Sequence, residues 1–147
     1  LRYKFFKAII LLSFLVPFLV LAGFSAYSSI NPYVSSKQAC DYLMKNHKIE
    51  SPIICSKFYA RGVRFYTGKD IVVAFDKGFF SPHPLEYVNN DEEVRDYLLK
   101  HKSSYCFFKK SSVDDMKRVL SMDKIFKATE LKVIGNTYLL KIELVSR

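Results

Sequence analysis

The chain lacks tryptophan and is poor in the residues that define several protein classes, with 5 glycines, 5 prolines and 3 cysteines among 147 residues. The low glycine and proline content excludes a collagen-like chain, and an aromatic content of 16% excludes a disordered one. Three cysteines cannot all pair with one another, which excludes a disulfide-dense mini-protein. The length is that of one domain.

A second absence is local, because no charged residue occurs from Ala8 to Ser36, a run of 29 positions. Its first part, Ala8–Ala26, has the length of a helix that crosses a bilayer, about 20 residues at a rise of about 1.5 Å per residue. Three basic residues precede this run, whereas the next charge is Lys37. This asymmetry predicts a cytoplasmic N-terminus and a domain on the extracytoplasmic side.

We therefore expect residues 1–27 to form a transmembrane helix with a basic flank, residues 28–36 a linker, and residues 37–147 an extracytoplasmic domain. A cleaved secretory signal is the alternative, because Ala26-Tyr27-Ser28 fits a small-x-small cleavage site. The sequence starts with leucine instead of methionine, from which we expect a tail of a longer protein. The last 111 residues carry 20 basic and 14 acidic residues, a net charge of +6.

Apolar residues in the domain alternate between helical and strand spacing. This order predicts an α/β fold, with a small, largely parallel sheet covered by helices and a C-terminal antiparallel hairpin around Gly135-Asn136. The longest irregular segment is Asp76–Asn90, and loops of this length are often functional. The predicted helices span about 36–47, 61–66, 91–102 and 112–122, and the predicted strands 52–58, 71–75, 104–109, 125–134 and 137–145.

The sequence does not have the residue spacing of a phosphate-binding loop or of a metal site. The segment Gly62–Lys69 follows a predicted strand, but five residues separate its glycines where a phosphate-binding loop has four, and Asp70 replaces the required Ser or Thr. Metal-ligand spacing is also missing, because there is no Cys-x-x-Cys or His-x-x-x-His pair and the three histidines are far apart in sequence. We expect no metal site and no cofactor in this chain.

Neither thiols nor carboxylates form a recognisable catalytic set. Cys40, Cys55 and Cys106 lie in apolar surroundings and are predicted to be buried, and whether one pair forms a disulfide stays open. The acidic clusters Asp91–Asp96 and Asp114-Asp115 lie at predicted helix starts, where they favour the helix dipole. We expect no catalytic residue in this chain.

The segment Phe58–Lys69 combines aromatic and basic residues. On a helix, its tyrosines and Val63 line one face while two arginines project together. They are either solvated charges on a packed helix or contacts to anionic lipid phosphates. We expect no nucleic-acid partner, because the domain is delivered across the membrane. The candidate contacts to lipid phosphates or to a membrane-embedded part are Arg61, Arg64, Tyr66 and Lys69.

The expected elements follow one another in a pattern: a membrane span, a capped helix, an apolar strand and then Phe65-Tyr66-Thr67-Gly68-Lys69-Asp70-Ile71-Val72-Val73. It resembles the C-terminal end of bacterial membrane glycosyltransferases of the GT-C class, relatives of the lipid A aminoarabinose transferase and the protein O-mannosyltransferases. The resemblance covers nearly the whole chain in architecture, but its specific motif is this short segment alone.

The resemblance implies a bacterial inner-membrane enzyme that transfers a sugar from a polyprenyl-phosphate donor to a lipid or protein acceptor. In that family the catalytic acidic residues follow the first membrane helix, in a region outside this chain. The domain would then be non-catalytic, with the lipid bilayer and the transmembrane part of the same enzyme as its partners. The alternative is a stand-alone, membrane-anchored or secreted α/β binding domain without enzymatic activity.

Overall fold

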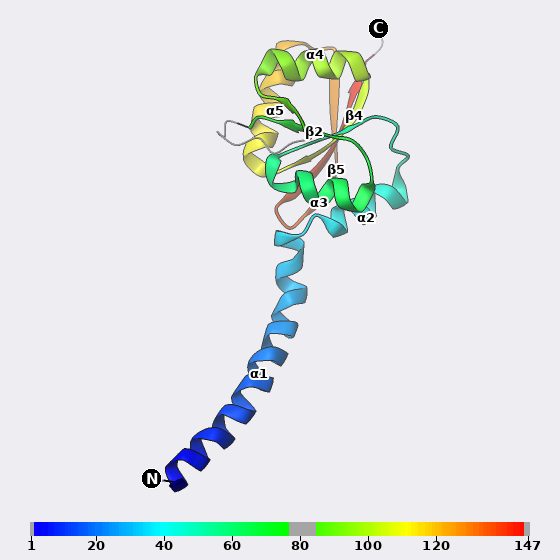
Figure 1. Cartoon of the computed structure of the whole chain (residues 1–147). Coiled ribbons are helices and arrows are strands. Elements are labelled where there is room, and N and C mark those ends of the chain that lie inside the picture. The colour runs from blue at the N-terminus through cyan, green and yellow to red at the C-terminus, as the bar shows by residue number, and fades with distance from the viewer. Residues whose placement is uncertain (1, 77–84, 146–147) are drawn as a thin grey trace.

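The computed structural model describes residues 2–76 and 85–145, with the backbone alone for residues 2–9, 28–30 and 32–34. A long helix, α1 (Arg2–Val34), extends away from the domain formed by the rest of the chain (Figure 1). Within the described residues, Ile10–Tyr27 is the one helical stretch long and apolar enough to cross a membrane, and none of it is buried in the protein. A bare apolar surface of this length suits surrounding lipid.

The expected linker, residues 28–36, is mostly helical instead of irregular. Helix α1 continues to Val34, and only Ser35 and Ser36 separate it from α2 (Lys37–Asn46). A proline removes a single helical hydrogen bond, and the chain after Pro32 still finds a helical partner: the Ser35 N–H donates to the Asn31 carbonyl at 2.8 Å. Helix α1 and the domain are therefore joined by a very short connection.

Six strands form one sheet in the order β3-β2-β1-β4-β6-β5. The first four run parallel, whereas β6 is antiparallel to β4 and pairs with β5 as the C-terminal hairpin. The predicted α/β fold and its closing hairpin are confirmed. The strands are β1 (Ile53–Cys55), β2 (Ile71–Ala74), β3 (Glu86–Val88), β4 (Ser103–Phe108), β5 (Phe126–Ile134) and β6 (Thr137–Leu144), and the remaining helices are α3 (Lys57–Thr67), α4 (Asp91–His101) and α5 (Lys110–Met122).

Helices cover both faces of the sheet, so successive strand residues enter two different cores. Along β1, Ile53 and Cys55 face the core under α2 and α3, whereas Ile54 faces the core under α4 and α5. Along β4, Phe107 faces the core under α2 and α3, and Cys106 faces the core under α4 and α5. Helices α2 and α3 lie at the end of the domain that α1 joins, and α4 lies at the opposite end (Figure 1).

Three local predictions differ from the structure. The expected loop 76–90 contains the edge strand β3, which pairs in parallel with β2; residues 77–84 of that loop lie outside the described residues. Helix α3 begins at Lys57 instead of Arg61, and α5 begins at Lys110 instead of the predicted capping box at Ser112. The Ser112 hydroxyl is buried and accepts a hydrogen bond from Ser56 at 2.9 Å, which is why it does not cap a helix.

Helix α3 makes a close contact with the residue before α2. A Cβ atom added at Gly62, in the middle of α3, would lie 2.5 Å from the Oγ atom of Ser36 and 3.7 Å from its Cβ atom. Ser36 is the residue before α2, and its side chain makes no capping hydrogen bond. Glycine at position 62 therefore allows the helix to approach this hydroxyl.

We predict that the effect of Gly62→Ala on stability depends on Ser36. In the native chain the new methyl group meets the hydroxyl, and overpacking of this kind costs about 1–3 kcal/mol, enough to cancel or exceed the gain of about 1 kcal/mol in helix propensity. In a Ser36→Ala background the obstruction is gone, and Gly62→Ala should stabilise the domain by about 1 kcal/mol. Urea unfolding of the four variants in detergent, followed by circular dichroism, measures this coupling; equal effects in both backgrounds would contradict the contact.

Candidate functional site

The basic and aromatic segment singled out in the sequence forms α3 and the turn after it. As predicted, Tyr59 and Val63 are buried and Tyr66 is half-buried on the same side, while Arg61 and Arg64 are exposed. The Tyr59 hydroxyl reaches the hairpin turn between β5 and β6, where it donates to a backbone carbonyl at 3.2 Å. Helix α3 is thus packed on the sheet by one face and presents the other to the surroundings.

The Thr67-Gly68-Lys69 part of the motif closes α3 and starts the turn into β2. Gly68 has a φ of 63°, and its N–H donates to the Arg64 carbonyl at 2.9 Å. The Thr67 hydroxyl donates to the Val63 carbonyl at 2.7 Å and accepts the N–H of Lys69 at 3.3 Å. A left-handed residue after the last turn favours glycine, so helix termination explains this part of the motif without a ligand.

Of the four predicted contact residues, Arg61, Arg64 and Lys69 are exposed and Tyr66 is half-buried. Among the described residues, no ion pair or side-chain hydrogen bond joins Arg61, Arg64 or the Lys69 ammonium to another group. The Tyr66 ring packs edge-on against Phe65, with 5.2 Å between ring centroids. These side chains form an exposed surface and not a closed binding site.

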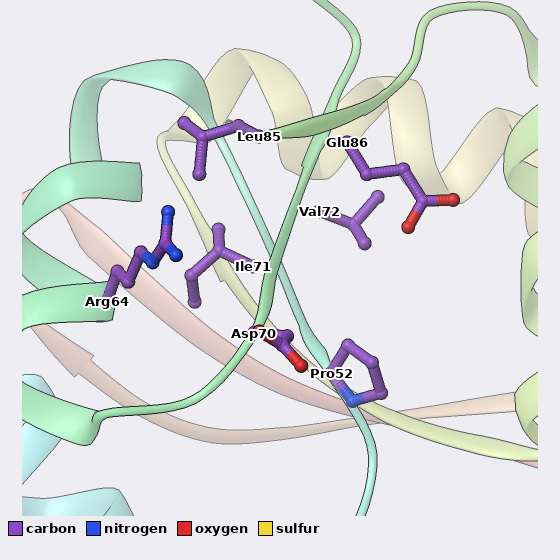
Figure 2. A pocket seen from close by; sticks show the side chains of 7 residues that line it. All are labelled: Pro52, Arg64, Asp70, Ile71, Val72, Leu85 and Glu86. Atoms are coloured by element: carbon purple, nitrogen blue, oxygen red, sulfur yellow. The ribbon is translucent and has the colours of Figure 1, made fainter. Parts of the chain in front are cut away.

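One of them, Arg64, lines a pocket of about 250 Å³ at the amino ends of β1, β2 and β3 (Figure 2). The carboxylates of Asp70 and Glu86 also border it, but Figure 2 shows the Glu86 carboxylate directed away from the arginine. Among the described residues that line it there is no histidine, serine or cysteine, so none of them forms a pair of nucleophile and base. The other lining residues are Pro52, Ile71, Val72 and Leu85.

Sequence reasoning missed two side chains on α3, Phe58 and Phe65. They are 67% and 81% exposed, although phenylalanine is usually buried. Seven residues apart, they lie on the same face two turns from each other. The signal was present in the sequence, but a helix predicted to start at Arg61 left Phe58 outside it.

The carboxyl ends of the parallel strands, where open α/β sheets usually bind ligands, are occupied by internal contacts. Ser56 after β1 donates to Ser112 and accepts the N–H of Lys109, after β4, at 3.3 Å. Beside them, Lys57 forms an ion pair of 2.8 Å with Asp76, after β2. Both serines are almost fully buried, so these contacts tie the strand ends together.

The described histidines contact aromatic rings. His47 packs against Tyr105 with 5.6 Å between centroids, and His101 against Tyr97 with 4.4 Å. Within residues 2–76 and 85–145, no three His, Cys, Asp or Glu side chains gather where they could hold a metal ion. His83 lies outside the described residues.

All three cysteines are buried free thiols, as expected from their apolar surroundings. Cys40 and Cys55 lie in the core under α2 and α3, and Cys106 lies in the other core. Burial raises the pKa of the Cys40 thiol from 9.0 to about 12, and it also raises the pKa of Cys55 and Cys106. Thiols held protonated in this way are poor nucleophiles.

Comparison with protein families, curated proteins and solved structures finds no match.

We predict that alkaline pH destabilises the domain through these thiols. Above pH 9, the ordinary thiol pKa, the unfolded chain releases protons that the folded chain keeps, so stability falls as the pH rises toward the folded pKa of Cys40, about 12. Well above pH 9 each buried thiol should lower the free energy of unfolding by about 1.4 kcal/mol per pH unit. Urea unfolding across this range should show a shallower fall for Cys40→Ala; an unchanged slope would argue against a buried, protonated Cys40.

Proposed function

We propose that this chain is the membrane-anchored C-terminal part of a GT-C glycosyltransferase, and that its α/β domain supports sugar transfer without performing it. The proposal is carried by one arrangement: an apolar helix of membrane-spanning length joins an α/β domain through two residues, beside the helix whose end carries the Phe-Tyr-Thr-Gly-Lys motif. The catalytic acidic residues would lie in the part of the enzyme before this chain.

The domain would lie on the extracytoplasmic side of a bacterial inner membrane. Three basic residues precede the apolar stretch of α1 and none occurs between Ala8 and Ser36, which favours a cytoplasmic start. The same side is where a polyprenyl-phosphate sugar would be used by an enzyme of this class. We propose a retained anchor in preference to a cleaved signal, because α1 runs without interruption past Ala26-Tyr27-Ser28 to Val34.

In this position the basic surface of α3 would act on the lipid-linked donor or on the membrane-embedded part of the enzyme. Arg61 and Arg64 are exposed, and α3 contains no acidic residue that would offset them. Guanidinium groups bind phosphates through two parallel hydrogen bonds, so they suit a lipid phosphate better than a neutral sugar. We assign them a role in holding the donor or the bilayer, with no cofactor in this chain.

A second candidate is a stand-alone membrane-anchored binding domain. It is favoured by the two cores of the domain, which bury apolar side chains on both faces of the sheet without help from α1. The reading frame before Leu1 separates the two candidates. Several further apolar spans with an acidic residue in the first outer loop would support the transferase, whereas a stop codon just before Leu1 would leave the binding domain.

We predict that Arg61→Ala with Arg64→Ala lowers sugar transfer in the full-length enzyme. A basic residue near an anionic lipid surface is worth about 1 kcal/mol, so losing two should reduce kcat/KM for the polyprenyl-phosphate donor about 10- to 30-fold. Lys117→Ala, which removes an exposed charge from α5, is the matched control and should leave transfer unchanged. Equal expression with undiminished transfer by the double variant would remove both arginines from the site.

We predict that a cysteine placed at Glu92 is labelled from outside intact cells. Glu92 is exposed on α4, at the end of the domain away from α1, and the native thiols are buried and should stay silent. A membrane-impermeant maleimide should therefore react with Glu92→Cys before permeabilisation. Labelling only after permeabilisation would invert the proposed orientation.

A further inference from the structure

Helix α3 exposes two phenylalanines, one turn before and about one turn after Gly62. Phe58, Gly62 and Phe65 are spaced by four and three residues, so they lie on one face of the helix. Both rings are more than half exposed, while the opposite face holds Tyr59 and Val63 in the core. Exposed rings gathered on one face, above a packed face, mark a surface that meets another apolar phase.

The middle of α3 touches the place where α1 joins the domain. Gly62 lies against Ser36, which is two residues beyond the end of α1. The two phenylalanines therefore lie one turn before and about one turn after the point where α3 touches the junction. In Figure 1, α3 also lies at the end of the domain from which α1 projects.

The charged residues of α3 itself are all basic. Helix α3 has three basic residues and no acidic one, and Arg61 is spaced three and four residues from Phe58 and Phe65. Lys57 is partly neutralised by Asp76, whereas Arg61 and Arg64 form no ion pair among the described residues. Apolar rings bordered by unpaired guanidinium groups complement an anionic lipid leaflet, with rings at the acyl boundary and charges on phosphates.

We propose that Phe58 and Phe65 insert into the interface of the leaflet from which α1 emerges, so that α3 lies along the membrane surface with Arg61 on lipid phosphates. The proposal rests on the anchoring of the chain by α1 but not on glycosyl transfer. It makes the bilayer the occupant of this face, and it fixes the orientation of the domain: α2 and α3 toward the membrane, α4 away from it.

Spin labels in the full chain test this orientation. A nitroxide is attached to Phe58→Cys or Phe65→Cys, one at a time, and to Glu92→Cys on α4 as the matched control; the buried native thiols stay unlabelled. Each chain is placed in nanodiscs that contain phosphatidylglycerol, at one chain per disc. Collision rates with oxygen, which enters lipid, and with a water-soluble nickel chelate are then measured by electron paramagnetic resonance.

Insertion predicts a nickel collision rate about fivefold lower at positions 58 and 65 than at position 92, with oxygen collisions raised. Replacing Phe65 by serine should restore nickel access to the label at position 58, and replacing phosphatidylglycerol by phosphatidylcholine should weaken the shielding. Equal nickel access at all three positions would overturn the proposal.

Other occupants give different results. Shielding from both oxygen and nickel would indicate a protein partner, and shielding that appears only with several chains per disc would indicate a second copy; either overturns the proposal. Loss of the chain from the disc fraction would overturn the anchoring on which it rests. No step of this experiment requires sugar transfer. If the labels insert but the full-length enzyme transfers no sugar, the proposed function is contradicted and the insertion of α3 is not.

Discussion

The close approach of α3 to Ser36 is the constraint on which the rest of the structure depends. It disfavours a side chain at Gly62, and it places a packed helix next to the two-residue connection from α1. Because α3 is held to the sheet by Tyr59 and Val63, the connection cannot move far without displacing core side chains. A longer linker would let the domain move freely relative to α1, whereas this contact restricts it.

The packing of the sheet explains why the candidate functional residues lie on the surface of the domain and not in its interior. Its central strands are short and buried on both faces, so β1 and β2 consist of apolar residues only. At their carboxyl ends, the buried Ser56 hydroxyl donates to Ser112 and accepts the N–H of Lys109, which avoids the cost of an unpaired buried polar group. At their amino ends, the pocket beside Arg64 has carboxylates that do not converge. What α3 exposes is therefore the strongest feature outside the core among the described residues.

The sequence alone was sufficient for the elements whose periodicity is long or unbroken. The apolar run of β2, the hairpin around Gly135-Asn136 and the helix stop at Gly68 each follow from a local rule that tertiary packing did not override. Strand β3 was missed because three residues with one buried side chain leave no periodic signal. The start of α5 was missed because Ser112 has the chemistry of a cap, but its hydroxyl bonds across the sheet.

The basic residues of the candidate site could be predicted from the sequence, but its exposed phenylalanines could not. Arg61 and Arg64 needed only helical spacing, but Phe58 and Phe65 are interpretable only once the other face of α3 is known to be full. A phenylalanine in a short segment is assigned to the core by default, because burial stabilises it by about 1.5–3 kcal/mol. Here Tyr59, Ala60 and Val63 already fill that side, and the remaining rings stay outside. In the proposed arrangement, lipid supplies the same stabilisation to the rings that the sheet cannot accommodate.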